Sequence, residues 1–413
     1  MTPSFDLVGL SEYSLFTING EDAATILTSR ITFIALVVCA AFLSGIALIG
    51  DPIECWCPAQ FTDSMCNYTK SLCWISENYV IDENGPLPFT LEDREEMPLR
   101  EMGFYPLVPF ILLGLAFFLN TPHFFWTAWQ AYGGVNVAHA VEMAVQDEGN
   151  ADNIAFNISF NRPSAMKFRG SSYIAKFITL VSAVGPLFFL GYDFGTFQTG
   201  LFLLTRLLTL GTIIAAFPLL SAVLQVNFFT WGFDLARGIY FDGEVPELYA
   251  FPRATMCDFK VRQMNNIQPY TVQCVLPINM WSEKVFIAFW FWLGLLLLAH
   301  LHSYQYWFRK LLFPGSRRAY VSKHMSVISP RWKNDKRKKK LVEDFAHKHL
   351  VFDHFLLLRV LELATGFVFA NDVLKTLWKK YEEGVAEREG RPPPDEVLAA
   401  TAPVTDDADL KEQ

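Results

Sequence analysis

Charged residues are scarce in this chain of 413 residues. Only 18% of them are Asp, Glu, Lys or Arg, whereas 52% are hydrophobic. About a quarter of the residues in a typical soluble domain are charged, so this chain is too apolar for an ordinary soluble domain of its length. The composition therefore predicts a membrane protein.

Signatures of catalysis are also missing. The sequence contains no phosphate-binding loop, no HExxH motif and no GxSxG motif, which mark nucleotide, zinc and serine-hydrolase chemistry. No histidine lies in residues 50–104 or 229–284, where most of the cysteines occur, and those cysteines lack the spacing of a zinc site. We therefore expect no catalytic residue, no metal site and no cofactor. A chain embedded in a membrane is not expected to bind nucleic acid.

Basic residues are absent from the start of the chain, where Arg30 is the first. A secretory signal peptide begins with basic residues, so none is expected, and residues 1–30 are interpreted as a cytoplasmic N-terminal segment. Residues 31–49 then form an uncharged run of nineteen, close to the roughly twenty residues that cross a bilayer. The sequence predicts the first membrane span here.

Three further spans are predicted, at residues 105–125, 207–228 and 285–303. Arg206 stands directly before the third of them. Because a long basic side chain at the end of a span can extend to the lipid headgroups, Arg206 is interpreted as an interfacial anchor rather than a gating charge.

Six of the seven cysteines lie between predicted spans, and the seventh, Cys39, lies within the first span. The six are Cys55, Cys57, Cys66 and Cys73 in residues 50–104, here called the first cysteine loop, and Cys257 and Cys274 in residues 229–284, the second cysteine loop. An even number of cysteines outside the membrane indicates disulfides, which persist in oxidising surroundings, so both loops are predicted to be extracellular. Bridges inside each loop and bridges between the loops are both compatible with the sequence.

The first cysteine loop also contains a glycosylation sequon, Asn67-Tyr68-Thr69. Such triplets often remain unmodified, and a glycan beside a docking surface would obstruct it. Asn67 is therefore a candidate glycosylation site whose occupancy the sequence leaves open.

One apolar stretch does not fit four spans. Residues 174–191 lie in the predicted cytoplasmic loop, 126–206, and are interrupted by Lys176 and by Gly185-Pro186. If both cysteine loops face outside, an even number of spans must separate them, and two are already assigned. The stretch is therefore interpreted as cytoplasmic, interfacial or re-entrant, with a gene-model error as the alternative.

A basic region follows the fourth span, with twelve Lys or Arg and one acid between Arg309 and Lys340. Its densest part, here called the basic cluster, consists of Arg331, Lys333, Lys336, Arg337, Lys338, Lys339 and Lys340. An excess of Lys and Arg beside a span belongs on the cytoplasmic side and attracts anionic lipid. Residues 304–389 are predicted to form a cytoplasmic helical region, and residues 390–413 a disordered tail.

Several of these stretches resemble one known family, the innexins, the gap-junction proteins of invertebrates. The resemblance rests on Pro52-Ile53-Glu54-Cys55-Trp56, Cys257-Asp258-Phe259, Val261-Arg262 and Tyr270-Thr271-Val272-Gln273-Cys274, and on Leu27-Thr28-Ser29-Arg30-Ile31-Thr32 before the first span. The loop positions carried over from the family motifs are Pro52, Trp56, Asp258, Phe259, Arg262, Tyr270 and Gln273. The start of the second span departs from the family, because only Tyr105, Val108 and Pro109 match its Tyr-Tyr-Gln-Trp-Val-Pro signature.

The resemblance implies a subunit of plasma-membrane channels that form gap junctions or hemichannels and pass ions and small molecules. It further implies an octameric ring, mixing with other innexins, docking with a ring on the adjacent cell, and an N-terminal segment that lines the entrance. Cys55, Cys73, Cys257 and Cys274 match the family's loop cysteines, whereas Cys57 and Cys66 are additional. The alternative function is a non-conducting adhesion or scaffold protein that uses the same loops.

The expected fold is therefore an all-α membrane protein. Each subunit should have four transmembrane helices, two disulfide-braced extracellular loops and helical cytoplasmic regions.

Overall fold

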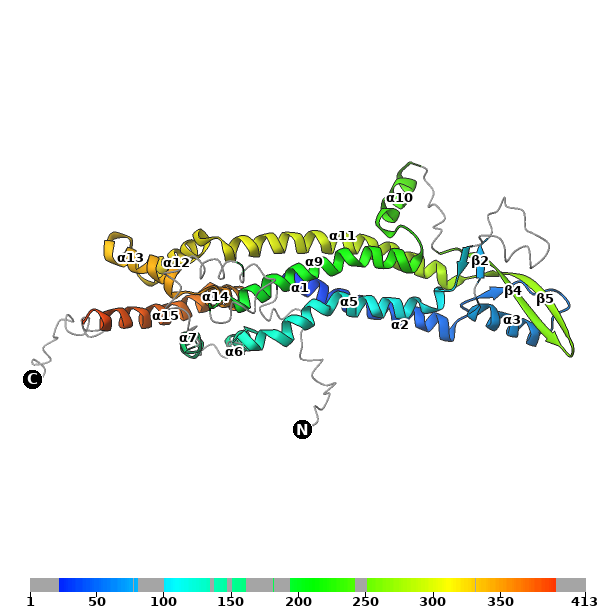
Figure 1. Cartoon of the computed structure of the whole chain (residues 1–413), viewed down its shortest axis with the longest axis horizontal. Helices are drawn as coiled ribbons and strands as arrows, with labels where there is room; N and C mark the ends of the chain where they lie inside the picture. The colour runs from blue at the N-terminus through cyan, green and yellow to red at the C-terminus, as the bar shows by residue number, and fades with distance from the viewer. Residues whose placement is uncertain are drawn as a thin grey trace, which may run out of the picture. The chain divides into compact units, whose positions relative to one another are not determined.

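The computed structural model describes residues 22–76, 78–80, 100–133, 137–146, 151–160, 181, 194–241, 251–330 and 332–390. Helices dominate these residues (Figure 1). The α-helices are α1 (Ala23–Ile26), α2 (Phe33–Ile49), α3 (Asp63–Ile75), α5 (Val108–Trp129), α6 (Val137–Gln146), α7 (Ala151–Phe160), α9 (Phe197–Leu224), α10 (Phe228–Phe241), α11 (Pro277–Leu312), α12 (Pro314–Ile328), α13 (Lys336–Asp344), α14 (Phe352–Thr365) and α15 (Phe367–Arg388). The strands are β1 (Glu54–Cys55), β2 (Asn78–Val80), β3 (Arg100–Met102), β4 (Ala254–Gln263) and β5 (Asn266–Val275).

Shorter turns of other helix types connect these elements. Two are π-helical, η2 (Leu27–Thr32) and η8 (Phe345–His349), and three are 3-10 helices, η3 (Tyr105–Leu107), η4 (Gln130–Gly133) and η7 (Trp332–Asn334).

The chain divides into two compact units. The membrane unit comprises Ala23–His123 and Leu208–His302, and the helical unit comprises Met1–Asp22, Phe124–Leu207 and Ser303–Gln413. The anomalous stretch 174–191 and the tail 391–413 fall outside the described residues, apart from position 181.

Four segments of the described residues are long and apolar enough to cross a membrane: Ala23–Ile49, Tyr105–Trp129, Phe197–Leu224 and Pro277–Leu312. They confirm the prediction of four membrane-spanning helices.

The third of these helices begins earlier than the sequence suggests, at Phe197 instead of 207. The prediction placed the start after Arg206 because an unpaired charge inside a span is costly. In the structure the Arg206 side chain is only 8% exposed and lies 3.8 Å from a carboxylate oxygen of Asp22. Arg206 was interpreted as an interfacial anchor at the start of the span; the structure instead places it inside α9, buried beside the carboxylate of Asp22.

Within the membrane unit, α2, α5, α9 and α11 run side by side (Figure 1) and share one apolar core. Each helix contributes fully buried leucines, among them Leu43, Leu112, Leu220 and Leu293. Lipid tails are as apolar as leucine, so close packing and hydrogen bonds between helices, rather than hydrophobic burial, must hold spans together.

Two such hydrogen bonds connect the Leu27–Thr32 motif to α11. The Thr28 Oγ1 and His300 Nε2 atoms are 2.6 Å apart, and the Trp292 indole donates to Thr32 Oγ1 at 2.8 Å. The motif forms the π-helical turn η2, a widened turn that often marks a functional position. Its hydroxyl groups thus fix the start of the first span against the fourth.

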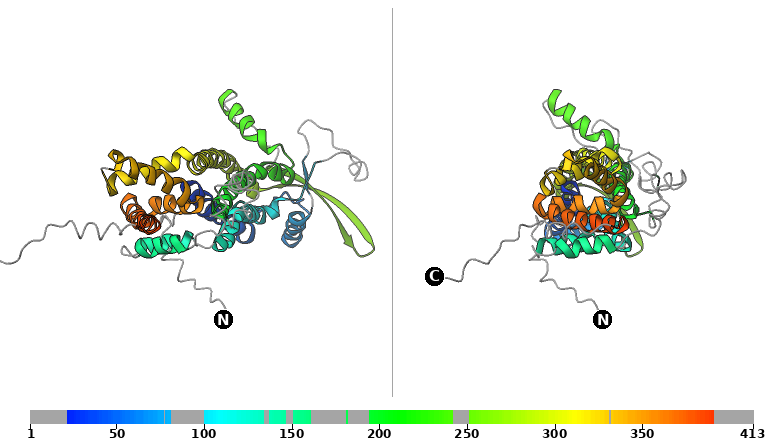
Figure 2. Two further views of the ribbon diagram at one scale, coloured as in Figure 1. Left: turned by 60° about the vertical axis from the view of Figure 1, so that its left-hand side comes forward. Right: turned by 90° about the vertical axis from the view of Figure 1, so that its left-hand side faces the viewer.

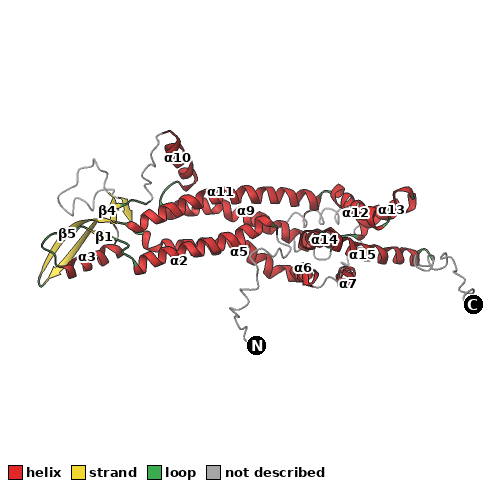
Figure 3. Cartoon of the chain, turned by 180° about the vertical axis from the view of Figure 1, so that it is seen from behind, coloured by secondary structure: helices red, strands yellow, loops and turns green. Residues whose placement is uncertain are grey.

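The cysteine loops contain a five-stranded antiparallel sheet, with strand order β1-β5-β4-β2-β3. The sheet lies at one end of the four helices of the membrane unit (Figure 3). The sequence analysis did not predict these strands. Their signal is the alternation of exposed and buried residues along β5, which is the period of a strand with one buried face.

The described part of the helical unit is built from stacked helices. Helices α14 and α15 pack against each other, with α6 and α7 on one side and α12 on the other (Figure 2). Phe345, Phe355, Leu358 and Leu361 are fully buried in its core. Their spacing along the chain is helical, which is why sequence alone indicates packed helices here.

A partly buried carboxylate, that of Asp353, joins this core to the start of α9. The Thr199 backbone N–H donates to Asp353 Oδ1 at 2.8 Å, and the Asp353 N–H donates to the carbonyl of Gly195 at 3.1 Å. Asp353 therefore satisfies a backbone group that the first turn of a helix leaves unpaired. Burial raises the pKa of Asp353 from its usual 3.8 to about 6, although hydrogen bonds from Thr199 and its neighbours lower it in part.

We predict that Asp353→Asn removes a pH dependence of stability. The folded protein binds the Asp353 proton at a higher pH than the unfolded chain, so this group adds stability as pH falls from 6 towards 3.8. As pH falls from 6 towards 3.8, the thermal unfolding midpoint of the wild type should therefore rise relative to that of the variant. A constant difference between the two proteins would contradict the prediction.

Candidate functional site

The second cysteine loop is organised by a long hairpin, β4 and β5. Ten residues of each strand pair, from Ala254 opposite Val275 to Gln263 opposite Asn266. Met264 opens the two-residue turn with φ of 52°, the positive value that tight hairpin turns require. Its side chain is 101% exposed. A bulky apolar residue held in this conformation at a hairpin tip is uncommon.

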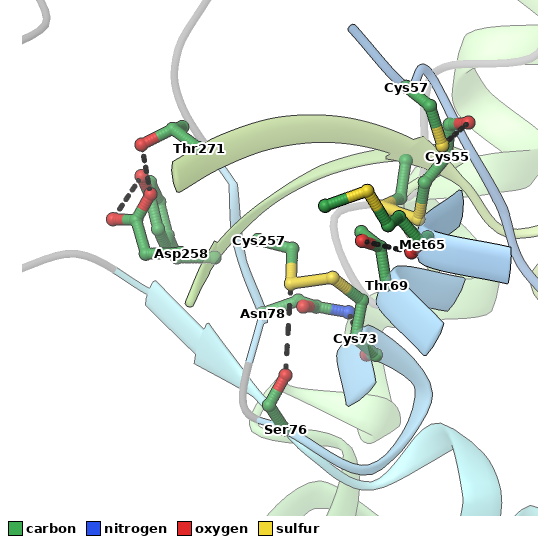
Figure 4. Close-up of a disulfide and its surroundings, with 12 residues drawn as sticks. Cys55, Cys57, Met65, Thr69, Cys73, Ser76, Asn78, Cys257, Asp258 and Thr271 are labelled. Atoms are coloured by element: carbon green, nitrogen blue, oxygen red, sulfur yellow. Dashed lines mark hydrogen bonds between the residues drawn. A yellow bond between two sulfur atoms is a disulfide. The ribbon is translucent and has the colours of Figure 1, made fainter. Parts of the chain in front are cut away.

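Three disulfides hold the loops. Two of them connect one loop to the other, and Figure 4 shows one of these, between Cys73 and Cys257. Cys55 is bonded to Cys274 across a sequence separation of 219, and Cys73 to Cys257 across 184. The third bridge, Cys57 to Cys66, closes a short segment inside the first loop. The sequence leaves open bridges within each loop and bridges between the loops, and the structure has bridges between the loops.

The two bridges between the loops lie next to each other. The sulfur atoms of Cys55, Cys73 and Cys274 are all within 4.8 Å of one another. Cys55 and Cys274 are also register partners of β1 and β5, so the first loop joins the sheet as an edge strand. The two loops therefore fold as one body.

Helix α3 packs on the hairpin through its buried face. Thr62 caps the helix by accepting from the N–H of Met65 at 3.4 Å. Cys73 is fully buried, and the Phe61 ring stands edge-on to Tyr270 at 5.1 Å. Between helix and hairpin lies a cavity of about 200 Å³ with mostly apolar walls, lined by Phe61, Ser64, Met65, Tyr68, Thr69, Phe259, Val261 and Tyr270.

Polar contacts connect the loops to the second span and to the hairpin. Asn78 donates to the carbonyl of Cys73 at 3.0 Å and also bonds the Tyr105 hydroxyl at the start of the span. Asp258 accepts from Tyr79 at 2.8 Å and from Thr271 at 2.6 Å (Figure 4 shows the latter). Tyr105, one of the matching positions of the altered signature, therefore holds the end of α3 in place.

The structure brings some of the family-motif residues together and leaves others at the surface. Asp258 makes the bonds just described, and the Phe259 and Tyr270 rings stack at 5.7 Å. The Gln273 carbonyl accepts from the Trp56 N–H at 2.8 Å, while the Trp56 side chain is 83% exposed. Pro52 is partly buried, and Arg262 is exposed.

The remaining candidate residues are distributed over two regions. Asn67 is exposed on α3, whereas Thr69 of its sequon is buried and donates to the Met65 carbonyl at 2.9 Å. In the basic cluster, Arg331 is not described, and the other members are exposed on η7 and α13. Arg337 pairs with Glu389 at 2.6 Å.

Sequence reasoning missed two features that the structure shows. The exposed hairpin tip at Met264 carries no motif, because Met264-Asn265 is not one of the Asn-Gly or Asp-Gly pairs that mark a two-residue hairpin turn. The pairing of Asp22 with Arg206 has no signal at all, because the two residues are far apart in sequence.

Comparison with known proteins identifies one family, both by a family model and by individual relatives. The family model described as Innexin matches residues 21–381. The chain is similar to Innexin-11 of Caenorhabditis elegans, with 31% identity over 344 residues that cover 81% of this chain and 73% of the relative. It is also similar to Innexin-12 and Innexin unc-9 of the same organism, with 27% and 29% identity. These matches cover 88% and 84% of this chain, and 89% and 88% of the relatives.

We predict that the bridges between the loops stabilise the protein more than the short one. A disulfide that closes a long segment restricts the unfolded chain more than one that closes a short segment. Cys73→Ser with Cys257→Ser should therefore lower the free energy of unfolding by about 3 to 5 kcal/mol, and Cys57→Ser with Cys66→Ser by clearly less. Thermal unfolding of the purified full-length variants measures both. Equal losses would refute the ranking.

Proposed function

The chain belongs to the innexin family, whose members form gap-junction channels in the plasma membrane, and we propose how this chain builds such a channel. Copies of it form an octameric ring, alone or with other innexins, and two rings from adjacent cells dock through the body formed by the two cysteine loops.

The observation that carries this proposal is the covalent joining of the two loops. Docking must seal two rings against the outside, so it requires loops that keep one shape. The Cys55–Cys274 and Cys73–Cys257 bridges attach the first loop to the hairpin of the second. A surface fixed in this way loses little conformational entropy when it meets its counterpart.

Exposed apolar side chains on this body support a contact with another protein. Trp56, Ile75, Met264 and Ile267 are 83%, 77%, 101% and 51% exposed. All four lie in the cysteine loops. Exposed aromatic and apolar groups on a rigid polar surface are typical of interaction sites.

The proposed topology follows from the same bridges. Disulfides persist outside the cell, so both loops are extracellular and the two termini are cytoplasmic. The basic cluster then faces the cytoplasm, where it can attract anionic lipid headgroups. The N-terminal segment is proposed to line the channel entrance, as the family resemblance implies.

We predict that paired cells expressing this chain, alone or with another innexin, show junctional conductance and pass small dyes. Cys274→Ser should reduce coupling to background while leaving synthesis and membrane insertion intact, because the spans insert through their own hydrophobicity. Dual voltage-clamp recording and surface labelling measure the two effects. If wild-type protein reaches contacting membranes but gives neither coupling nor single-membrane conductance, the adhesion function replaces the channel.

A further inference from the structure

Helix α10 follows the third span and begins by turning back against it. The chain reverses at Gln225, whose φ is 53°, and the Phe228 N–H then donates to Ser221 Oγ at 3.0 Å. The Trp290 indole donates to the Phe228 carbonyl at 2.9 Å. Ser221 and Trp290 both lie inside segments that are long and apolar enough to cross a membrane. The start of α10 is therefore level with the spans, several residues inside the ends predicted for the third and fourth of them.

The axis of α10 runs across the spans instead of along them. Figures 1 and 3 show it crossing the direction of α9 and α11. Phe228, Trp231 and Leu235 of α10 are buried in the core of the membrane unit. Gly232 lies so close to Trp290 that a Cβ atom there would overlap the indole ring. The helix is thus fixed to the outside of the four-helix bundle, in an orientation close to the plane of a membrane that the spans cross.

A second face of α10 carries aromatic side chains that the subunit leaves exposed. Phe229, Phe233 and Tyr240 are 61%, 62% and 82% exposed, and Ala236 is exposed as well. These four positions follow one another at intervals of four, three and four residues, which puts their side chains on one side of a helix. They are here called the aromatic face.

A third face of α10 is polar. Thr230, Asp234 and Arg237 are exposed, and each directly follows a position of the aromatic face. The polar face is therefore turned from the aromatic face by about 100°. A helix with an apolar and a polar face in this relation is typical of the boundary between lipid tails and headgroups. Asp234 and Arg237 carry opposite charges, so the polar face has no net charge.

We propose that α10 lies in the membrane interface and inserts its aromatic face into the leaflet next to the cysteine loops. Its partner is a zwitterionic lipid surface, because the polar face balances one acid with one base. With the loops outside the cell, as in the proposed topology, this is the outer leaflet. The second cysteine loop is then attached to the bilayer by an interfacial helix in addition to the spans at its two ends.

A neighbouring subunit is the other surface that can cover the aromatic face. Protein interfaces carry about one hydrogen bond per 100–200 Å², whereas on this face only the Tyr240 hydroxyl can form one. Phenyl rings and a tyrosine match the lipid boundary better, because a tyrosine there keeps its ring among the lipid tails and its hydroxyl among the headgroups. The composition of the face therefore favours lipid.

The test measures what surrounds a nitroxide label on α10, in assembled full-length protein reconstituted into phosphatidylcholine nanodiscs. Cys39→Ala first removes the one cysteine outside the disulfides. Labels are then attached through Ala236→Cys and Tyr240→Cys on the aromatic face, and through Thr230→Cys on the polar face as the matched control. Met264→Cys at the hairpin tip is the reference for water. Collisions with oxygen, which concentrates in lipid, are compared with collisions with a nickel chelate, which stays in water.

We expect the ratio of oxygen to nickel-chelate accessibility at both aromatic-face labels to exceed the ratio at Met264 by about fivefold or more. The label at Thr230 should give a lower ratio than either of them. Adding anionic lipid or raising the KCl concentration should leave the ratios unchanged, because the polar face has no net charge.

Three results would overturn the proposal. Aromatic-face labels that the nickel chelate reaches as readily as at Met264 lie in water, and labels that neither reagent reaches lie against a neighbouring subunit. A ratio that rises with anionic lipid and falls with salt rejects the zwitterionic surface.

A second measurement needs no substitution and decides if the labelled variants do not assemble. Wild-type protein is irradiated with a phosphatidylcholine that carries a diazirine in its acyl chain, and the adducts are mapped by mass spectrometry. We expect adducts at Tyr240. Labelled spans without an adduct on the aromatic face of α10 would reject the proposal.

Discussion

The structure depends on one constraint, the covalent joining of two loops that are far apart in the sequence. Cys55–Cys274 and Cys73–Cys257 span separations of 219 and 184 residues, and two membrane-spanning helices lie between the bonded positions. Both loops must therefore reach the same oxidising compartment before either bridge can form. The bridges thus constrain the topology of the spans as well as the shape of the sheet, and they make the two loops a single unit.

Hydrogen bonds and ion pairs fix the helices against one another, as the disulfides fix the two loops against each other. In a lipid environment apolar packing alone does not select one arrangement of helices, so hydrogen bonds and ion pairs provide the selectivity. Thr28 and Thr32 bond α11 through His300 and Trp292 in the membrane unit. In the helical unit, Arg206 is compensated by Asp22. Each pair is formed by residues on different segments, so each fixes one segment against another.

The sequence predicts features that depend on neighbouring residues, such as membrane spans, but it does not predict which residues pair when they are far apart in the chain. The uncharged run before Gly50 and three similar runs were enough to predict four spans, because crossing a bilayer imposes a length and a composition. The hairpin of β4 and β5 was not predicted although alternation is visible in β5, because no Asn-Gly or Asp-Gly pair marks its turn. The partners of Cys55 and Cys73 could not be derived, because cysteine spacing does not encode connectivity. Arg206 was misinterpreted for the same reason: its partner lies in a distant part of the chain.

The central claim is that the two cysteine loops form one covalently closed body on the outside of the cell. Mass-spectrometric mapping of disulfides, on protein labelled at the surface of intact cells and digested without reduction, tests it directly. The account predicts linked peptides that contain Cys55 with Cys274 and Cys73 with Cys257. Peptides that link Cys55 to Cys73 and Cys257 to Cys274, or free thiols at these four positions, would contradict it.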